Sequence, residues 1–287
     1  MTTPTDQTVI SAGSRSGSTP AALPLGGSRT VLELKAFFRE RDAVIFSFLF
    51  PFIMLGIFSV VFGGEASSLG GGPAIDFTQY FLPGMIAAGI FLVSFQTLAI
   101  TIALERDDGT LKRLRGTPMP PVSYFLGKIG MVLITAVAQT AILLAYAALV
   151  FRVPLPNTAS SWLTFTWVFV LGTAAGTVLG IAYSSVPKSG RSAPAVVTTP
   201  LLILQFISGV FFVFSDLPTW LQHIASIFPL KWTAQGMRSV FLPPEYEAAE
   251  VSGSWQHGLT AVILTVWLIM GLIVCIRTFR WQRRDAG

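Results

Sequence analysis

The sequence contains little charge. Of its 287 residues only 11% are Asp, Glu, Lys or Arg, whereas 52% are hydrophobic and the mean hydropathy is +0.67. A soluble globule of this size needs far more polar side chains to cover its surface. The scarcity of charge therefore excludes a soluble protein and places the chain among membrane proteins.

Cysteine, histidine and nucleotide-binding motifs are also scarce. The single cysteine, Cys275, can form no intrachain disulfide, and His223 and His257 are far apart in the sequence. No G-x-x-x-x-G-K-[ST] phosphate loop occurs. We therefore expect no catalytic residues, no metal and no cofactor in this chain, and we expect any ATP and Mg²⁺ to be bound by a separate chain. The chain is not expected to be an enzyme.

Long apolar runs, by contrast, are frequent. A hydrocarbon core of about 30 Å requires roughly 20 apolar residues in a helix. Six runs of about this length lack charged residues: 43–62, 80–104, 129–151, 162–186, 193–215 and 258–276. Because the runs are continuous rather than alternating, they predict helices. The predicted fold class is an all-α integral membrane protein with six transmembrane helices.

The first span is preceded by two segments of different character. Residues 1–27 are rich in Ser, Thr, Pro and Gly and contain no apolar run, which predicts a disordered tail rather than a signal peptide. In residues 28–42, Thr30 and Glu33 have capping-box spacing, and apolar residues follow a helical stripe. We expect an amphipathic helix in the membrane interface. The alternative, an extension of the first span, is opposed by the charges in residues 39–42.

The basic residues predict an orientation. If both termini lie on one side, sixteen of the nineteen Lys and Arg residues fall on that side, and only Arg152, Lys231 and Arg238 fall on the other. Cytoplasmic loops carry an excess of basic residues, so both termini are predicted to be cytoplasmic. The net charge of +5 is then a topology signal, and no nucleic-acid partner is expected.

The densest charge lies between the second and third spans, in "LERDDGTLKRLRGTPMPP". Leu111 and Leu114 form a short apolar stripe that glycine and proline bound, which predicts a helix of one or two turns. An ordinary solvated cytoplasmic loop is the simplest interpretation. The apolar stripe favours instead a surface that docks on another protein. The acidic pair Asp107 and Asp108 suggests a partner with a basic groove rim.

This loop resembles a known family. The pattern E-[RK]-x-x-G-T-L-x-x-L-x-x-[ST]-P is similar to the first cytoplasmic loop in permease subunits of type-2 ABC transporters, in particular the drug-resistance, daunorubicin-exporter-like permeases. The matching residues are Glu105, Arg106, Gly109, Thr110, Leu111, Leu114, Thr117 and Pro118. A second similarity lies in residues 208–240, where Ser-Gly, Leu-Pro-x-Trp, Pro and Arg follow in the family's order. Together the resemblance covers residues 28–284 as one permease domain.

The resemblance implies roles for two segments. Residues 105–121 would form a cytoplasmic coupling loop that rests in a groove of the ATPase, and the helix at 28–42 would also touch that partner. The coupling residues are Glu105, Arg106, Gly109, Thr110, Leu111, Leu114, Arg115 and Pro118. Residues 216–240 would form a pair of short re-entrant helices that close the outer end of the path. The outer-gate residues are Ser208, Gly209, Pro218, Trp220, Ile224, Pro229 and Arg238.

Polar and small residues inside the spans have two interpretations each. Gln96, Gln139 and Gln205 are typical of hydrogen bonds between helices. A substrate path through Gln96, Gln205, Phe206 and Phe211 is the functional alternative, because Gln205 lies beside a cluster of phenylalanines. The glycines in "LGTAAGTVLG" favour static packing inside one subunit, with a sliding surface as the alternative.

These features predict a permease subunit of an ATP-driven exporter for a hydrophobic or amphipathic substrate, drug or lipid-like. By resemblance its partners are an ABC ATPase subunit, a second permease copy or paralogue, and membrane lipids, in the bacterial inner membrane. Two alternatives remain. An ion- or proton-coupled carrier is opposed by the absence of charges in the spans. A non-transporting membrane scaffold subunit would have no path of its own.

Overall fold

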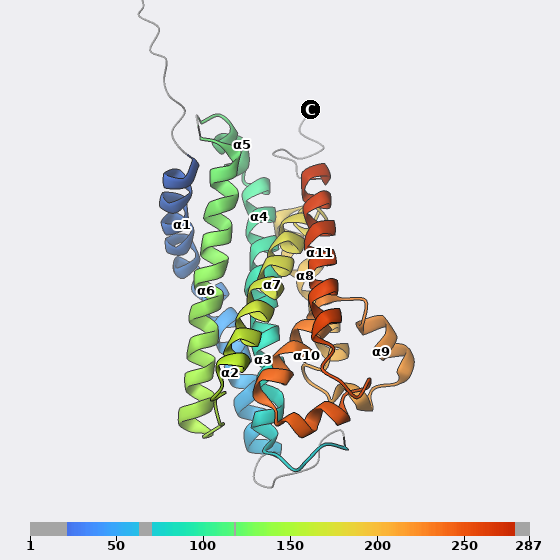
Figure 1. The fold of residues 1–287 in the computed structure, drawn as a ribbon. Helices are drawn as coiled ribbons and strands as arrows, with labels where there is room; N and C mark the ends of the chain where they lie inside the picture. Colours follow the sequence, from blue (N-terminus) through green and yellow to red (C-terminus); the bar gives the residue numbers. More distant parts are fainter. Residues whose placement is uncertain (1–21, 63–70, 118, 279–287) are drawn as a thin grey trace, which may run out of the picture.

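The computed structural model describes residues 22–62, 71–117 and 119–278, which are mostly helical. Five stretches of helix in this part of the chain are long and apolar enough to cross a membrane. They lie side by side in one bundle (Figure 1). They are α2 (Arg41–Phe62), the continuous rod of α3 (Phe77–Phe91), the π-helical η2 (Leu92–Thr97) and α4 (Leu98–Asp107), α6 (Pro121–Val150), α7 (Ala159–Tyr183), and α11 (His257–Thr278).

The predicted count of six spans is not reproduced. Within the run 193–215, only the first 15 residues are α-helical, as α8 (Ala193–Ile207). At a rise of about 1.5 Å per residue, this helix is about 22 Å long. The helix ends at Ser208 because Gly209 has a left-handed backbone, with φ of +74°. The chain then turns through residues 208–213 into the 3-10 helix η4 (Phe214–Asp216). Hydropathy continues past Gly209, but the helix does not.

The second and third spans begin or end further out than predicted, and the added turns carry charge. The second rod runs on to Asp107 and α6 begins at Pro121, so Glu105, Arg106 and Lys128 belong to membrane-length helices. The rod of α3, η2 and α4 is the most deeply buried of the five. Gly180 of α7 lies so close to it that a Cβ atom there would be 2.7 Å from the Ser94 carbonyl oxygen. The glycine stripe therefore packs inside the subunit, as the static interpretation predicts.

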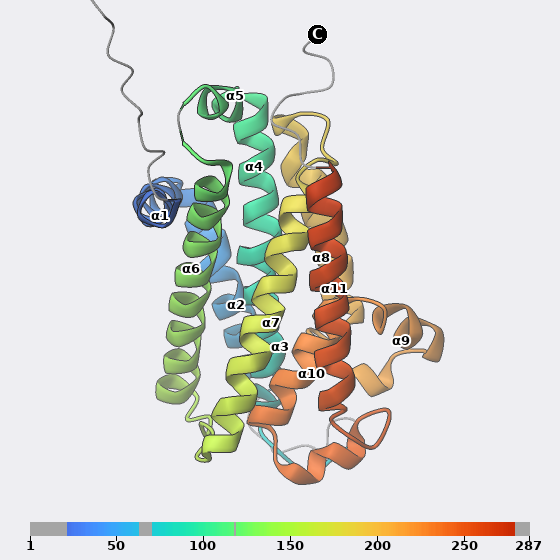
Figure 2. The ribbon, with the colours of Figure 1, turned by 45° about the horizontal axis from the view of Figure 1, so that its top comes forward.

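The N-terminal helix α1 (Ala22–Arg39) packs against α6. Figure 2 views α1 end-on while α6 runs lengthwise, so α1 crosses the bundle instead of continuing it. A break at Glu40 separates α1 from α2, so α1 is a helix of its own, as predicted. Its start is earlier than expected, and the predicted tail of residues 1–27 is wrong for residues 22–27. The earlier start is explained by Gly26, which has no side chain and therefore lets the first turns of α1 pack closely against Leu126 of α6. Residues 1–21 are outside the described residues.

The segment after α8 folds into two short helices, as predicted. They are α9 (Thr219–Ala225) and α10 (Pro229–Phe241), followed by the 3-10 helix η5 (Pro244–Ala249). The break between them lies at residues 226–228, just before Pro229. Proline fits the first turn of a helix, where no amide donor is needed, so it begins α10. Helix α10 is buried against α3 and α7, whereas α9 projects from the side of the bundle (Figure 1).

Candidate functional site

The charged loop forms α5 (Thr110–Arg115), at the end of the bundle where α11 also ends (Figure 1). Gly109 precedes it with φ of +79°, a conformation that glycine adopts without strain. The Asp108 carboxylate accepts a hydrogen bond from Thr110 N at 2.8 Å. Leu111 is fully buried within the chain, so the apolar edge expected to meet a partner is used internally. Leu114 is half-buried and packs against the buried apolar cluster that contains Leu111. Pro118 is outside the described residues.

Glu105 joins three helices at this end of the bundle. Lys128 Nζ of α6 lies 2.6 Å from Glu105 Oε1 and 2.6 Å from Glu33 Oε2 of α1. Tyr124 donates its hydroxyl to Glu105 Oε2 at 2.7 Å, and Arg29 pairs with Glu33 at 2.6 Å. We call these five residues the cytoplasmic ion cluster. Two cations balance two carboxylates, and the Lys128 side chain is fully buried.

The next two residues of the motif bind the far side of the bundle. Arg106 donates to the carbonyl and hydroxyl oxygens of Ser184, just after α7, at 2.6 and 3.1 Å. Asp107 Oδ2 accepts from Gly190 N at 3.0 Å, in the 3-10 helix η3 (Gly190–Ser192) that leads into α8. The loop is therefore bonded directly to α6, to Ser184 after α7 and to η3, and through Lys128 to α1. Arg115 and its neighbours Lys112 and Arg113 are exposed.

Sequence reasoning missed the partners of the motif. Lys128, Tyr124 and Ser184 were not among its candidate residues, and Lys128 was counted only as a topology charge. The sequence signal that could have identified Lys128 was its position, directly before an apolar run that becomes a helix. Asp107 and Asp108 accept hydrogen bonds inside the chain, so the structure gives no support to a basic partner groove.

The opposite end of the bundle contains a second buried ion pair. Arg238 of α10 is 1% exposed, and its Nε donates to Glu250 Oε1 at 2.6 Å. Its Nη1 donates to the Gly209 carbonyl at 3.4 Å. The structure thus brings together three predicted outer-gate residues, Ser208, Gly209 and Arg238, and adds Glu250, which sequence reasoning missed. The arrangement fixes the end of α8 against α10.

Lys231 of α10 is a buried cation beside this pair. Its ammonium donates to Gln235 Oε1 and lies 5.1 Å from the centre of the Phe214 ring. Burial, with a smaller contribution from the charge of Arg238, lowers the pKa of Lys231 to about 8. Gln235 in turn donates to the Trp255 carbonyl at 3.1 Å. These contacts hold α10 against the chain that leads into α11.

Helix α9 turns its apolar side outward. Trp220, Ile224 and Ile227 are 64%, 42% and 61% exposed, whereas Gln222 is buried. Pro218 is the N-cap of α9 and Pro229 begins α10, so both prolines bound the helices as predicted. These apolar side chains therefore face away from the bundle.

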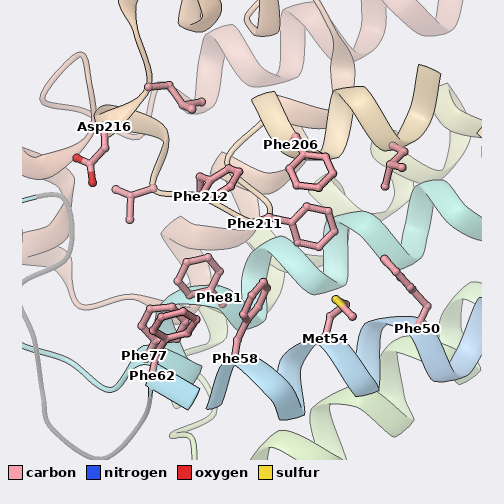
Figure 3. A pocket seen from close by; sticks show the side chains of 13 residues that line it. Phe50, Met54, Phe58, Phe62, Phe77, Phe81, Phe206, Phe211, Phe212 and Asp216 are labelled. Carbon is pink, nitrogen blue, oxygen red and sulfur yellow. The ribbon is translucent and has the colours of Figure 1, made fainter. Parts of the chain in front are cut away.

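An aromatic cleft of about 610 Å³ lies between α2, α3 and the end of α8 (Figure 3). Its lining is apolar except for one carboxylate: Phe50, Met54, Phe58, Phe62, Phe77, Phe81, Leu202, Phe206, Phe211, Phe212, Val213, Asp216 and Leu217. Of the predicted substrate path, Phe206 and Phe211 line the cleft. Gln96 and Gln205 do not, since both are buried in the bundle. Gln139 donates to the Ser47 carbonyl at 2.9 Å, which confirms an interhelical hydrogen bond.

Comparison with known proteins identifies a family to which the chain is similar. The family model described as "ABC-2 family transporter protein" matches residues 71–276. "Probable multidrug ABC transporter permease YbhR" of Escherichia coli (strain K12) is 25% identical over 174 residues, which cover 59% of this chain and 45% of the relative. "Inner membrane transport permease YadH" of the same strain is 22% identical over 197 residues, 67% of this chain and 74% of the relative. The chain thus matches less than half the length of YbhR.

Proposed function

The chain belongs to the ABC-2 family of transporter proteins, and from this premise we propose that it is the membrane-spanning permease subunit of an ATP-driven exporter. The expected cargo is a hydrophobic or amphipathic molecule. ATP and Mg²⁺ would be bound by a separate ATPase subunit, and a second permease copy or paralogue would complete the path. The setting is a bacterial inner membrane, with both termini in the cytoplasm.

The observation that carries this proposal is the bonding of the charged loop. Glu105, Arg106 and Asp107 bind α6, the end of α7 and the start of α8. Charge-assisted hydrogen bonds are short and directional, so a displacement of α5 moves the helices bonded to it. A cytoplasmic ATPase that closes against this loop would therefore act on the whole bundle. Glu105 itself faces inward and would transmit this movement, without forming the docking contact.

The docking surface would be the exposed side of α5. Lys112, Arg113 and Arg115 are exposed, so the complementary groove on the ATPase should be acidic. This reverses the expectation from Asp107 and Asp108. Helix α1 lies next to the same end and would extend the contact.

The outer half would provide the gate. We propose that α8 and the irregular segment 208–213 together make a sixth crossing, because non-helical backbone is tolerated at membrane depth where it is buried in protein. Helices α9 and α10 would then be re-entrant. The exposed Trp220 and Ile224 would meet lipid, while Arg238 and Glu250 stay inside the protein.

The experiment is transport by the reconstituted complex. The permease is purified with the ATPase that accompanies it and placed in inside-out vesicles, and uptake of a fluorescent amphiphile is followed. Uptake should require ATP hydrolysis, persist with a proton uncoupler, and fail when the phosphate-loop lysine of the ATPase is replaced. Loss of uptake with the uncoupler at constant ATP would instead indicate a proton-coupled carrier. Absence of uptake despite ATP hydrolysis would indicate a scaffold subunit.

A further inference from the structure

Among the described residues that line the aromatic cleft, one has an ionisable side chain, the carboxylate of Asp216. This side chain is exposed, and among the described residues no Lys or Arg forms an ion pair with it. The nearby cations are engaged elsewhere, since Arg238 pairs with Glu250 and Lys231 donates to Gln235. Within the part of the chain that the structure describes, the cleft therefore has a negative end whose carboxylate forms no ion pair.

Hydrogen bonds hold the backbone segment that carries this carboxylate. Buried Gln222 donates its amide to the carbonyl oxygens of Ser215 and Leu217, at 3.2 and 2.7 Å. These two residues flank Asp216 in the chain. The amide of Asp216 itself donates to the Val213 carbonyl at 3.2 Å. The backbone of Asp216 is thus fixed at the mouth of the cleft by a side chain outside the lining.

The body of the cleft is built from phenyl rings. The Phe211 ring lies 5.0 Å from that of Phe206 and 6.2 Å from that of Phe58, centre to centre. Toward the end of α2, the Phe77 ring stacks on that of Phe81 at 4.3 Å. In Figure 3, Asp216 lies at one end of this row and Phe50 at the other. Ring faces carry negative electrostatic potential, which attracts cations and offers nothing to anions.

We propose that the cleft binds an amphiphilic organic cation. Its apolar body would lie among the phenyl rings, and its positive centre would lie next to Asp216. The volume of about 610 Å³ suits one such molecule, since small-molecule sites are commonly about 300–1,000 Å³. An anion of the same shape would meet both the carboxylate and the ring faces unfavourably. The proposal deepens the proposed function, because it names the charge class of the cargo.

Entry to the cleft is from the α8 side. Leu202, Phe206 and Phe212 line it and are 42%, 43% and 51% exposed on the chain. Because α8 is an apolar helix of the bundle, this opening faces the bilayer or a neighbouring subunit. Amphiphilic cations partition into membranes, so a lateral opening receives them from the lipid.

The first test compares two ions of matched shape and opposite charge. Tetraphenylphosphonium and tetraphenylborate binding is measured on the full chain in uncharged phosphatidylcholine nanodiscs. We expect saturable binding of the cation only, weakened about fivefold or more by Asp216→Asn. The control Glu245→Gln removes an exposed acid of the segment after α10, outside the cleft, and should leave binding unchanged. Equal binding of both ions, or an unaltered Asp216→Asn variant, overturns the proposal.

The second test locates the bound cation. In a Cys275→Ser background, a thiol reagent is applied to Leu202→Cys, inside the cleft, and to Leu163→Cys, an exposed position on α7. Tetraphenylphosphonium should slow labelling at the first position and not at the second. Equal rates at Leu202→Cys with and without the cation contradict the site. Spontaneous disulfide formation between two copies through Leu202→Cys would contradict entry from the lipid, because a second subunit would then cover the opening.

These measurements are separate from transport. Binding needs neither ATP nor an ATPase, so an exporter with a different cargo would give ATP-driven uptake but no selective binding. A binding protein that does not transport would give the reverse result. Failure of one proposal is therefore distinguishable from failure of the other.

Discussion

Lys128 Nζ donates to Glu105 Oε1 across 2.6 Å, although 23 residues separate the two in the chain. The same ammonium binds Glu33, 95 residues away, at the same distance. One buried cation thereby connects the predicted coupling motif to the N-terminal helix. Glu105 belongs to the motif that was expected to contact the ATPase, yet its carboxylate contacts side chains of the same chain. Mutations at Glu105 should therefore act first on the bundle.

Removal of this cation should destabilise the fold. Lys128→Met leaves the half-buried Glu105 without a cation and leaves Glu33 with Arg29 as its single counter-charge, and breaking a buried ion pair costs about 3–5 kcal/mol. Thermal unfolding in nanodiscs, followed by tryptophan fluorescence, should show a lower midpoint. Lys112→Met, which removes an exposed lysine of α5, should leave the midpoint unchanged. Equal midpoints for both variants would show that the cluster contributes little to stability.

Charge reversal on the exposed side of α5 should act on the partner instead. Arg115→Glu leaves the internal contacts of the loop intact, so the unfolding midpoint should stay the same. If an acidic groove of the ATPase receives α5, binding of that subunit and ATP-driven uptake should fall about tenfold or more. Co-purification yield and vesicle uptake measure the two effects. Normal uptake in this variant would remove α5 from the docking surface.

Gly209 should not tolerate a side chain. Its φ of +74° is strained for alanine, and a Cβ atom would lie 3.1 Å from Arg238 Nη1 and 3.0 Å from Phe214 Cβ. We expect Gly209→Ala to lower the free energy of unfolding by about 1–3 kcal/mol. Gly27→Ala is the matched control, because Gly27 is helical and nothing lies within 4 Å of its missing Cβ. That variant should be slightly more stable, by about 0.5–1 kcal/mol.

The orientation predicts a labelling pattern. In a Cys275→Ser background, Ser252→Cys should react in intact cells with a membrane-impermeant thiol reagent, since residue 252 is exposed in the outer segment after η5. Ser185→Cys, exposed in the turn between α7 and α8, should react only after the cells are opened. Reaction at residue 185 in intact cells would reverse the topology.

The sequence by itself determined the membrane class, five of the helices and the short helices on either side of Pro229. These features depend on local properties: apolar length sets a span, and glycine or proline sets where a helix begins or ends. The family resemblance in residues 105–118 is local in the same sense, because it is carried by consecutive side chains. Each of these could be predicted without knowing what lies across the bundle.

Only the tertiary structure decided where the charges of those segments go. Glu105 faces Lys128 and Glu33, and Arg238 faces Glu250, because helices distant in sequence meet in space. The end of α8 could not be predicted for the same reason, since residues 210–213 are apolar enough for a span yet turn away after Gly209. Phe211, Phe212 and Val213 then line the cleft, and the Gly209 carbonyl accepts a hydrogen bond from Arg238 of α10. Hydropathy measures the preference of a residue for an apolar environment. It does not tell whether an apolar residue contacts lipid or the phenylalanine side chains of the same chain. The cleft could therefore be recognised only in the folded structure.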